Sequence, residues 1–162
     1  MTEPLLKTLF VSAALSIAAT MAVATDGTVE SPSAVEQWEA DRTVGFDAQD
    51  VDLEDFLWIA RPVVVFADTP ADPAFQQQLS LLNERIDELV DRDVVLITDT
   101  SRSDLSDIRR KLRPRGFMLT VIGKDGGVKL RKPFPWDVRE LSRSIDKMPL
   151  RRQEIRGRAT AQ

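Results

Sequence analysis

Two short apolar runs, Val63 to Phe66 and Val94 to Ile97, constrain the fold of this chain more than any other feature. Both runs are continuous rather than alternating, which is typical of strands that are buried on both faces of a parallel sheet. A strand, a helix and a second strand in succession place the two strands parallel, with a right-handed crossover. The segment between the runs supplies that helix, since its apolar residues recur at steps of four and three: Phe75, Leu79, Leu82, Ile86 and Leu89.

The rest of the chain adds a short helix, a hairpin and a final helix. Ser103 is positioned to cap the short helix, and Phe117 to Ile122 is predicted as a third strand. Lys124 to Gly127 has glycines where a hairpin turn needs positive φ, and Val128 to Arg131 returns as a polar edge strand. We therefore predict an α/β fold, a thioredoxin-like three-layer sandwich whose mixed four-stranded sheet has helices on both faces.

The amino-terminal residues have the pattern of a secretory signal. Lys7 precedes an apolar run from Thr8 to Val23, and small residues occupy the cleavage-site positions Ala22 and Ala24. A single membrane anchor is the alternative, but a run this rich in Ala, Ser and Thr is weakly apolar for a span. We therefore expect a periplasmic or secreted protein with no membrane span after signal cleavage.

The chain divides into four predicted parts. Residues 25–50 are acidic and lack a sustained apolar period, apart from one helical turn at Ser33 to Trp38. We predict a signal peptide at 1–24, an acidic flexible arm or linker at 25–50, the thioredoxin-like domain at 51–154 and a frayed basic tail at 155–162.

The composition excludes several kinds of chemistry. The sequence has no cysteine, no histidine and no tyrosine. Without cysteine the protein cannot be a thiol oxidoreductase, and without histidine it has no Ser-His triad and no imidazole metal site. No pair of carboxylates is isolated in an apolar segment, so no catalytic residue is predicted. We expect no cofactor and no metal.

Charge is distributed unevenly along the chain. Residues 25–100 hold eighteen acidic and four basic side chains, whereas residues 101–162 hold seven acidic and seventeen basic ones. The basic third either neutralises the acidic part within one fold or faces a polyanion, and we favour neutralisation. Nucleic acid is not an expected partner, because stacking aromatics are not interleaved with the basic residues.

Three stretches resemble one protein family. These are Val121 to Lys129, Ile145 to Arg152 and the first strand, Arg61 to Ala67. They are similar to domain-of-unknown-function family 4174, which occurs in bacterial exported proteins and in vertebrate sushi-repeat-containing matrix proteins. The likeness extends from about Leu53 to Glu154. It implies a thioredoxin-like, peroxiredoxin-related fold and no established activity.

The loop after the first strand is a candidate anion or ligand site. The resemblance to peroxiredoxins implies that Thr69 matches their threonine and Arg115 their arginine, although no peroxidatic sulfur is present. The start of the following helix has free N–H groups that favour an anion. Asp72 is equally suited to cap that helix, which is the simpler interpretation. The candidate ligand site is therefore Thr69, Asp72 and Arg115.

A second candidate site is a basic surface. The dense run that starts at Arg109 could contact phosphate or sulfated glycan by neutralising its charge. The alternative is a solvated helix face that pairs with Asp104 and Asp107. The residues of this candidate surface are Arg109, Arg110, Arg113, Lys129 and Arg131.

The residues favour a non-catalytic binding or adaptor module of the cell envelope over an enzyme. The partner would be an unidentified envelope protein or a polyanion. The alternatives are an enzyme that uses the loop before the first helix of the core, and a polyanion-binding protein that uses the basic third. Five side chains are predicted to form the core: Val64, Phe66, Leu82, Ile97 and Leu119.

Overall fold

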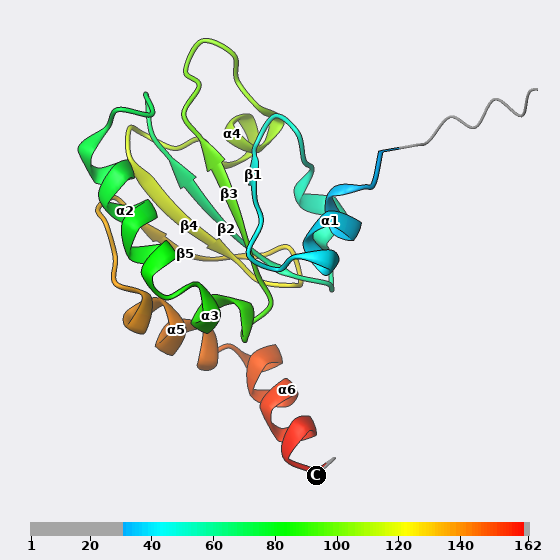
Figure 1. The fold of residues 1–162 in the computed structure, drawn as a ribbon. Coiled ribbons are helices and arrows are strands. Elements are labelled where there is room, and N and C mark those ends of the chain that lie inside the picture. Colours follow the sequence, from blue (N-terminus) through cyan, green and yellow to red (C-terminus); the bar gives the residue numbers. More distant parts are fainter. Residues whose placement is uncertain (1–30, 161–162) are drawn as a thin grey trace, which may run out of the picture. The chain divides into compact units, whose positions relative to one another are not determined.

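The computed structural model describes residues 31–160, so the predicted signal peptide lies outside the described residues. Within the described part, five strands form one sheet in the order β1-β3-β2-β4-β5 (Figure 1). Strands β1, β3 and β2 are parallel, whereas β4 is antiparallel to β2 and β5 to β4. The strands are β1 (Gly45–Asp47), β2 (Arg61–Phe66), β3 (Val94–Asp99), β4 (Met118–Ile122) and β5 (Val128–Lys132).

The four strands β3-β2-β4-β5 have the thioredoxin-like order and directions. Both continuous apolar runs form strands, and Val64 of β2 pairs with Ile97 of β3 and with Thr120 of β4. The predicted hairpin joins β4 to β5, and Gly126 has the positive φ (73°) that its turn requires. These features confirm the predicted α/β class.

Strand β1 is the one that the sequence did not predict. It pairs with the outer edge of β3, with Phe46 opposite Ile97. The segment Gly45–Asp47 has one apolar residue, so its order comes from the backbone groups of β3 rather than from its own composition. The prediction of four strands is therefore wrong by one, and the arm predicted at 25–50 contains a strand.

Helix α1 (Ala34–Ala40) also belongs to the fold. A capping box starts it: Glu36 N donates to Ser33 Oγ at 3.3 Å, and Ser33 N donates to a Glu36 carboxylate oxygen at 2.8 Å. Trp38 is 1% exposed, and its indole N–H donates to the carbonyl of Val94 at 3.3 Å. Residues 33–47 therefore form part of the folded domain rather than a flexible arm.

Two layers of helices cover the sheet. Val64 and Phe66 of β2 face a core with α1, η1 and α4, whereas Val63 and Val65 face a core with α2, α3 and α5. Figure 1 shows α2, α3 and α5 together on one side of the sheet and α1 on the other. The remaining helices are η1 (Leu53–Phe56), α2 (Pro73–Glu84), α3 (Ile86–Val90), α4 (Asp107–Leu112), α5 (Val138–Asp146) and α6 (Pro149–Thr160).

The predicted core is confirmed. Val64, Phe66, Leu82, Ile97 and Leu119 each have 0% of their surface exposed. Complete burial of such side chains contributes about 1.5–3 kcal/mol each. The continuous runs in the sequence thus identify the centre of the sheet correctly.

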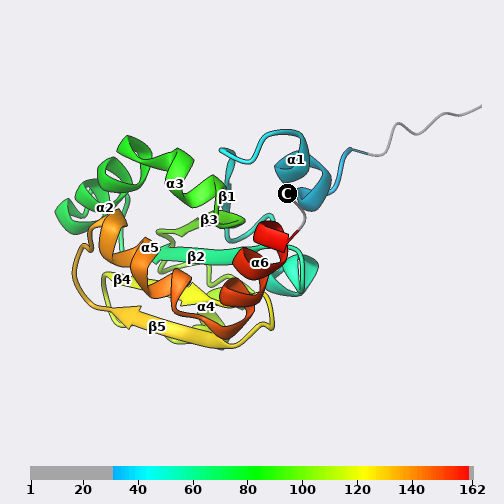
Figure 2. The same ribbon diagram turned by 90° about the horizontal axis from the view of Figure 1, so that it is seen from below.

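Helix α6 replaces the predicted frayed tail. It continues to Thr160, and Figure 2 shows it beside the amino end of β2. Arg151 is 6% exposed, and Glu154 forms an ion pair with Arg61 of β2. Two charged contacts therefore anchor the first half of this helix to the sheet.

None of the helices in the described residues is both long enough and apolar enough to cross a membrane.

Candidate functional site

The carboxyl ends of β2 and β3 meet at one edge of the sheet, where a buried arginine joins them. Arg109 of α4 is 7% exposed, and its Nε donates to Oδ1 of Asp99, the last residue of β3, at 2.8 Å. Its Nη2 donates to the carbonyl of Ala67, which follows β2, at 2.7 Å and to the carbonyl of Asp99 at 2.8 Å. One guanidinium therefore connects the ends of both central strands.

The ion pair is largely buried, with Arg109 7% and Asp99 2% exposed. Ser106 Oγ donates to Asp99 Oδ2 at 2.6 Å and also caps α4 by accepting from the backbone N–H of Arg109 at 2.9 Å. The guanidinium carbon of Arg109 lies 5.4 Å from the ring centroid of Phe66, within cation–π distance. Arg109 is thus a structural residue, and its assignment to an exposed basic surface is wrong.

Next to Arg109 the surface has a depression of about 590 Å³. A volume of this size falls in the range of about 300–1,000 Å³ that small-molecule sites occupy. Five arginines line it, against one carboxylate and three uncharged residues. The lining residues are Asp68, Arg102, Leu105, Arg109, Arg110, Arg113, Pro114, Arg115 and Gly116. This excess of positive charge attracts anions.

Two exposed arginines of the lining have carboxylate partners. Arg102 Nη1 lies 3.0 Å from Asp68 Oδ2, and the other oxygen of Asp68 lies 3.9 Å from the buried Arg109. Arg110 Nη1 lies 2.6 Å from Asp107 Oδ1, in a pair whose members are both well exposed. Exposed pairs of this kind contribute little to stability, about 0–1 kcal/mol, and they open readily.

The other two arginines lie in the loop between α4 and β4. Arg113 and Arg115 are exposed, and within residues 31–160 no carboxylate lies within 4.0 Å of either one. Arg113 ends α4 in the left-handed conformation (φ 49°), and Gly116 has a positive φ of 61°. A bulky residue is uncommon in that conformation. This loop thus carries the two guanidinium groups that are free to meet a ligand.

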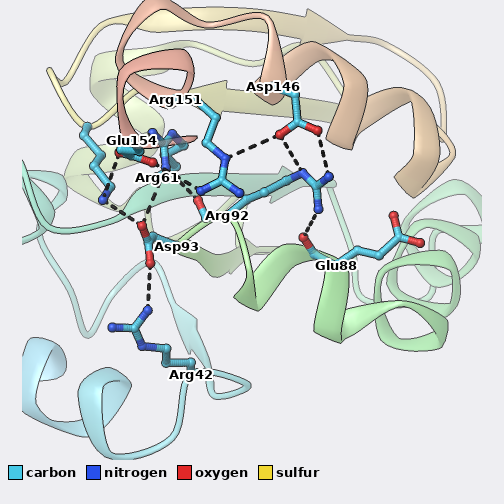
Figure 3. Close-up of polar contacts among 9 residues, drawn as sticks. Arg42, Arg61, Glu88, Arg92, Asp93, Asp146, Arg151 and Glu154 are labelled. Atoms are coloured by element: carbon cyan, nitrogen blue, oxygen red, sulfur yellow. Dashed lines mark hydrogen bonds and ion pairs between the residues drawn. The ribbon is translucent and has the colours of Figure 1, made fainter. Parts of the chain in front are cut away.

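The amino end of the sheet also carries charges, but there they form a closed network (Figure 3). Arg61 of β2 is 1% exposed; its Nη2 lies 2.7 Å from Glu154 Oε1, and its Nη1 donates to the carbonyl of Arg92 at 2.7 Å. Lys124 Nζ bridges Glu154, at 3.3 Å, and Asp93, at 2.8 Å. The network joins α6 to the hairpin, to the first residue of β2 and to Asp93, which precedes β3.

Further pairs extend the network to α1 and α5. Arg42, which follows α1, lies 2.7 Å from Asp93, and Arg92 lies 2.7 Å from Asp146 at the end of α5. Arg151 Nε lies 3.4 Å from Asp146. The cavity nearest to this network has only about 80 Å³. Each of these charges is thus matched by a neighbour, with little room for a ligand.

Two carboxyl groups of the network have shifted acidities. Burial raises the pKa of Asp93, but hydrogen bonds and charges from Lys124 and Arg42 outweigh burial and hold that pKa below its ordinary value. Burial also raises the pKa of Glu154, and Arg61 and Lys124 outweigh it in the same way. Both groups therefore stay ionised in moderately acidic solution and keep the network intact.

The family model described as "Domain of unknown function (DUF4174)" matches residues 52–154. This chain belongs to that family. The match confirms the resemblance in the closing motifs and in the first strand. It starts after α1 and β1, so the structural domain is longer than the matched segment at its amino-terminal side.

Among solved structures, the DUF4174 chain is similar to peroxiredoxins of Plasmodium species. The reduced Plasmodium vivax 2-Cys peroxiredoxin is 16% identical, with a TM-score of 0.48, over 59% of this chain and 81% of that one. The mitochondrial 2-Cys peroxiredoxin of Plasmodium falciparum is 17% identical, with a TM-score of 0.42, over 62% and 84%. These values describe a likeness in the path of the chain and carry nothing about activity.

The predicted ligand site of the DUF4174 domain is not brought together. Asp72 caps α2, accepting from the N–H groups of Ala74 at 2.8 Å and Phe75 at 3.3 Å. Thr69 Oγ1 accepts from the N–H of Ala71 at 3.3 Å. Only Arg115 lines the depression. The helix start is therefore occupied by its own side chains, and the positive charge lies beside it.

The predicted basic surface is also divided. Arg110 and Arg113 line the depression, but Lys129 and Arg131 do not. Lys129 Nζ lies 2.6 Å from Asp125 in the hairpin, and Arg131 Nη1 donates to the carbonyl of Leu112 at 2.6 Å. The basic third of the chain is thus partly neutralised within the fold, and the residues of the predicted basic surface do not share one site.

Arg102 and Asp68 are the site residues that sequence reasoning missed. They are thirty-four positions apart in the chain, and the right-handed crossover brings them to 3.0 Å. The available signal was positional, because each residue follows one of two adjacent parallel strands, whose carboxyl ends meet at the same edge. Within the described residues, no group of three or more His, Cys, Asp or Glu side chains could hold a metal ion.

Proposed function

We propose that this DUF4174 protein is an exported, non-catalytic binding module that holds an acidic partner at the arginine-lined depression. The observation that carries the proposal is the charge of that lining, with five guanidinium groups of which Arg113 and Arg115 have no carboxylate within 4.0 Å in residues 31–160. Export rests on the signal pattern at residues 1–24.

The arrangement of the site favours binding over reaction. The buried charge pair at the edge of the depression, Arg109 with Asp99, has its hydrogen-bonding partners within the protein. The exposed groups are guanidiniums, which remain protonated and act as hydrogen-bond donors rather than as acids, bases or nucleophiles. The absence of cysteine excludes a thiol cycle at this position.

Capture from an envelope extract tests the binding role. We expect the wild-type protein to retain a partner that is released by moderate salt, since exposed charges are screened over about 10 Å at 0.1 M ionic strength. The double change Arg113→Ser and Arg115→Ser should abolish retention. The matched control Arg156→Ser and Arg158→Ser removes the same charge from exposed positions on α6 and should retain the partner. Equal retention by both variants would refute the proposal.

Intact-mass measurement tests export. The protein recovered from the periplasm or medium should begin at Thr25, immediately after the Ala22-Val23-Ala24 cleavage site. A mass that retains Met1 to Ala24 would instead indicate an uncleaved anchor. Assays of insulin reduction and peroxide consumption should show no turnover, and turnover by purified protein would contradict the non-catalytic role.

A further inference from the structure

The lining of the depression carries more positive than negative charge, and the size of the excess can be counted. Three of its five guanidinium groups have carboxylate partners: Arg109 with Asp99, Arg102 with Asp68, and Arg110 with Asp107. Two remain without a carboxylate within 4.0 Å in residues 31–160, Arg113 and Arg115. The lining therefore presents two uncompensated positive charges.

A ligand that matches two positive charges at one place is a dianion. A phosphate monoester carries about −1.5 to −2 at pH 7, because its second pKa is about 6. A carboxylate or a sulfate ester carries only one negative charge. The planar fork of arginine also matches phosphate oxygens in a bidentate geometry. Charge and geometry thus agree on a terminal phosphate.

The lining also has room for the organic part of an ester. Leu105 is 40% exposed at the depression, and Pro114 and Gly116 add further uncharged surface. The depression, at about 590 Å³, has room for a group beyond the phosphate.

Asp68 is the residue that competes with such a ligand. Its carboxylate lies 3.0 Å from Arg102 and 3.9 Å from Arg109, and about 36% of its side chain is exposed. It lies two residues after the end of β2, and its side chain is less exposed than that of Arg102, which is 75% exposed and free to move. An incoming phosphate would draw Arg102 away from Asp68 and would be repelled by the carboxylate.

We propose that the depression binds a terminal phosphate group through Arg102, Arg113 and Arg115, and that Asp68 is an internal counterion which limits the affinity. The inference rests on the proposed binding function and specifies its ligand. The phosphate can belong to a soluble monoester or to a lipid headgroup that ends in a monoester, since both present the same dianion.

Calorimetric titration of the purified exported protein with glycerol 3-phosphate at low ionic strength tests the proposal. Arg113→Ser with Arg115→Ser should weaken binding at least ten-fold, whereas Arg156→Ser with Arg158→Ser should change it less than two-fold. Asp68→Asn should tighten binding about three-fold, because a like charge is removed near the anion. Asp125→Asn is its matched control, with a side chain 35% exposed and paired to Lys129, and should leave affinity unchanged.

Two further comparisons test whether the site recognises phosphate rather than any dianion, and whether the phosphate comes from a lipid or from a soluble ester. Succinate, a dianion of carboxylates, should bind at least ten-fold more weakly than glycerol 3-phosphate. Binding to phosphatidic acid vesicles that exceeds binding to phosphatidylglycerol vesicles of equal surface charge would identify a lipid source, and binding of glycerol 3-phosphate alone a soluble one. Either result supports a terminal phosphate.

Several results would overturn the inference. No saturable binding of any terminal phosphate, equal binding by the Arg113 and Arg115 variant, equal binding of succinate, or weaker binding by Asp68→Asn would each do so. If envelope capture depends on Arg113 and Arg115 while no terminal phosphate binds, the proposed function stands and this inference alone fails. Urea unfolding of each variant verifies that the fold is intact.

Discussion

The two ends of the sheet use the same residue types in opposite ways. At the amino end, Arg61 is 1% exposed and paired with Glu154, and the adjacent cavity is about 80 Å³. At the carboxyl end, Arg113 and Arg115 are exposed, have no carboxylate within 4.0 Å in residues 31–160, and border about 590 Å³. Arginine therefore stabilises the fold at one end and is available to a ligand at the other.

The difference shows that a count of basic residues does not reveal a binding surface. Of the seventeen basic residues after position 100, Arg109, Lys124 and Arg151 are committed to internal partners. What distinguishes a ligand-binding arginine is exposure without a matching carboxylate beside a depression. The following predictions test this distinction, starting with the largest expected effect.

Removing Glu154 should strongly destabilise the protein. Glu154→Ala leaves the cation of Arg61 buried, with Asp93 as its nearest carboxylate at 3.9 Å. The loss of a partner from a buried pair costs about 3–5 kcal/mol. The equivalent change at the other end, Asp68→Ala, removes the partner of an exposed arginine and should cost less than about 1 kcal/mol. Urea unfolding measures both, and equal losses would contradict the contrast between the two ends.

Removing Arg109 should have the next largest effect, although it lies at the carboxyl end. Arg109→Met leaves Asp99 2% exposed, with the hydroxyl of Ser106 as its remaining side-chain partner. We expect a loss of about 3 kcal/mol, at the lower end of the range for a broken buried pair. The double variant Arg109→Met, Asp99→Asn should lose less than the single one in urea melts, because no buried charge is left unpaired. A larger loss would argue against the ion pair as the cause.

Acid should weaken the amino end in a defined pH range. The pKa values of Asp93 and Glu154 are below their ordinary values, so each adds stability above the unfolded pKa, about 4, that is lost as pH falls through the folded pKa. The free energy of unfolding should therefore change little from these groups between pH 7 and 5 and fall below about pH 4. In Lys124→Met the decline should be smaller. An unchanged acid profile in that variant would refute the role of Lys124.

The smallest expected effect is that of Arg113→Gly, which should raise the stability of the protein but weaken its binding of phosphate. Arg113→Gly relieves a left-handed conformation, which glycine adopts without strain, and should raise the free energy of unfolding by about 0.5–1 kcal/mol. The same change removes one uncompensated guanidinium and should weaken phosphate binding. Thermal unfolding and calorimetry together test both signs. A loss of stability would mean that the Arg113 side chain supports the fold.

The centre of the fold was predictable because local signals and burial agree. The runs at Val63 and Val94 and the periodic helix between them leave few alternatives for the sheet. Strand β1 was not predictable in this way, because the three residues Gly45–Asp47 form a strand only by pairing with the backbone of β3. The helical turn predicted at Ser33 to Trp38 is the start of α1, whose capping box of Ser33 and Glu36 is visible in the sequence, but its packing against the core is not.

The candidate site was predictable only where its residues are close in sequence. Arg110, Arg113 and Arg115 stand out as a dense run, and all three line the depression. The burial of Arg109 within the same run depends on Asp99 and on the carbonyl of Ala67, which only the folded sheet brings together. Arg102 shows no local pattern, because its partner Asp68 lies in the loop that follows β2, thirty-four positions earlier in the chain.

The pairing of β1 with β3 has a practical consequence for recombinant fragments. A fragment cut at the family boundary, residue 52, would lack β1 and leave the β3 backbone groups at Leu96 to Thr98 without their partners. It would also uncover the apolar surface against which Trp38 and Phe46 pack. An unpaired, hydrophobic parallel edge is a template for intermolecular β-pairing. Such a fragment should aggregate, whereas a fragment that begins at Ser31 keeps the edge covered.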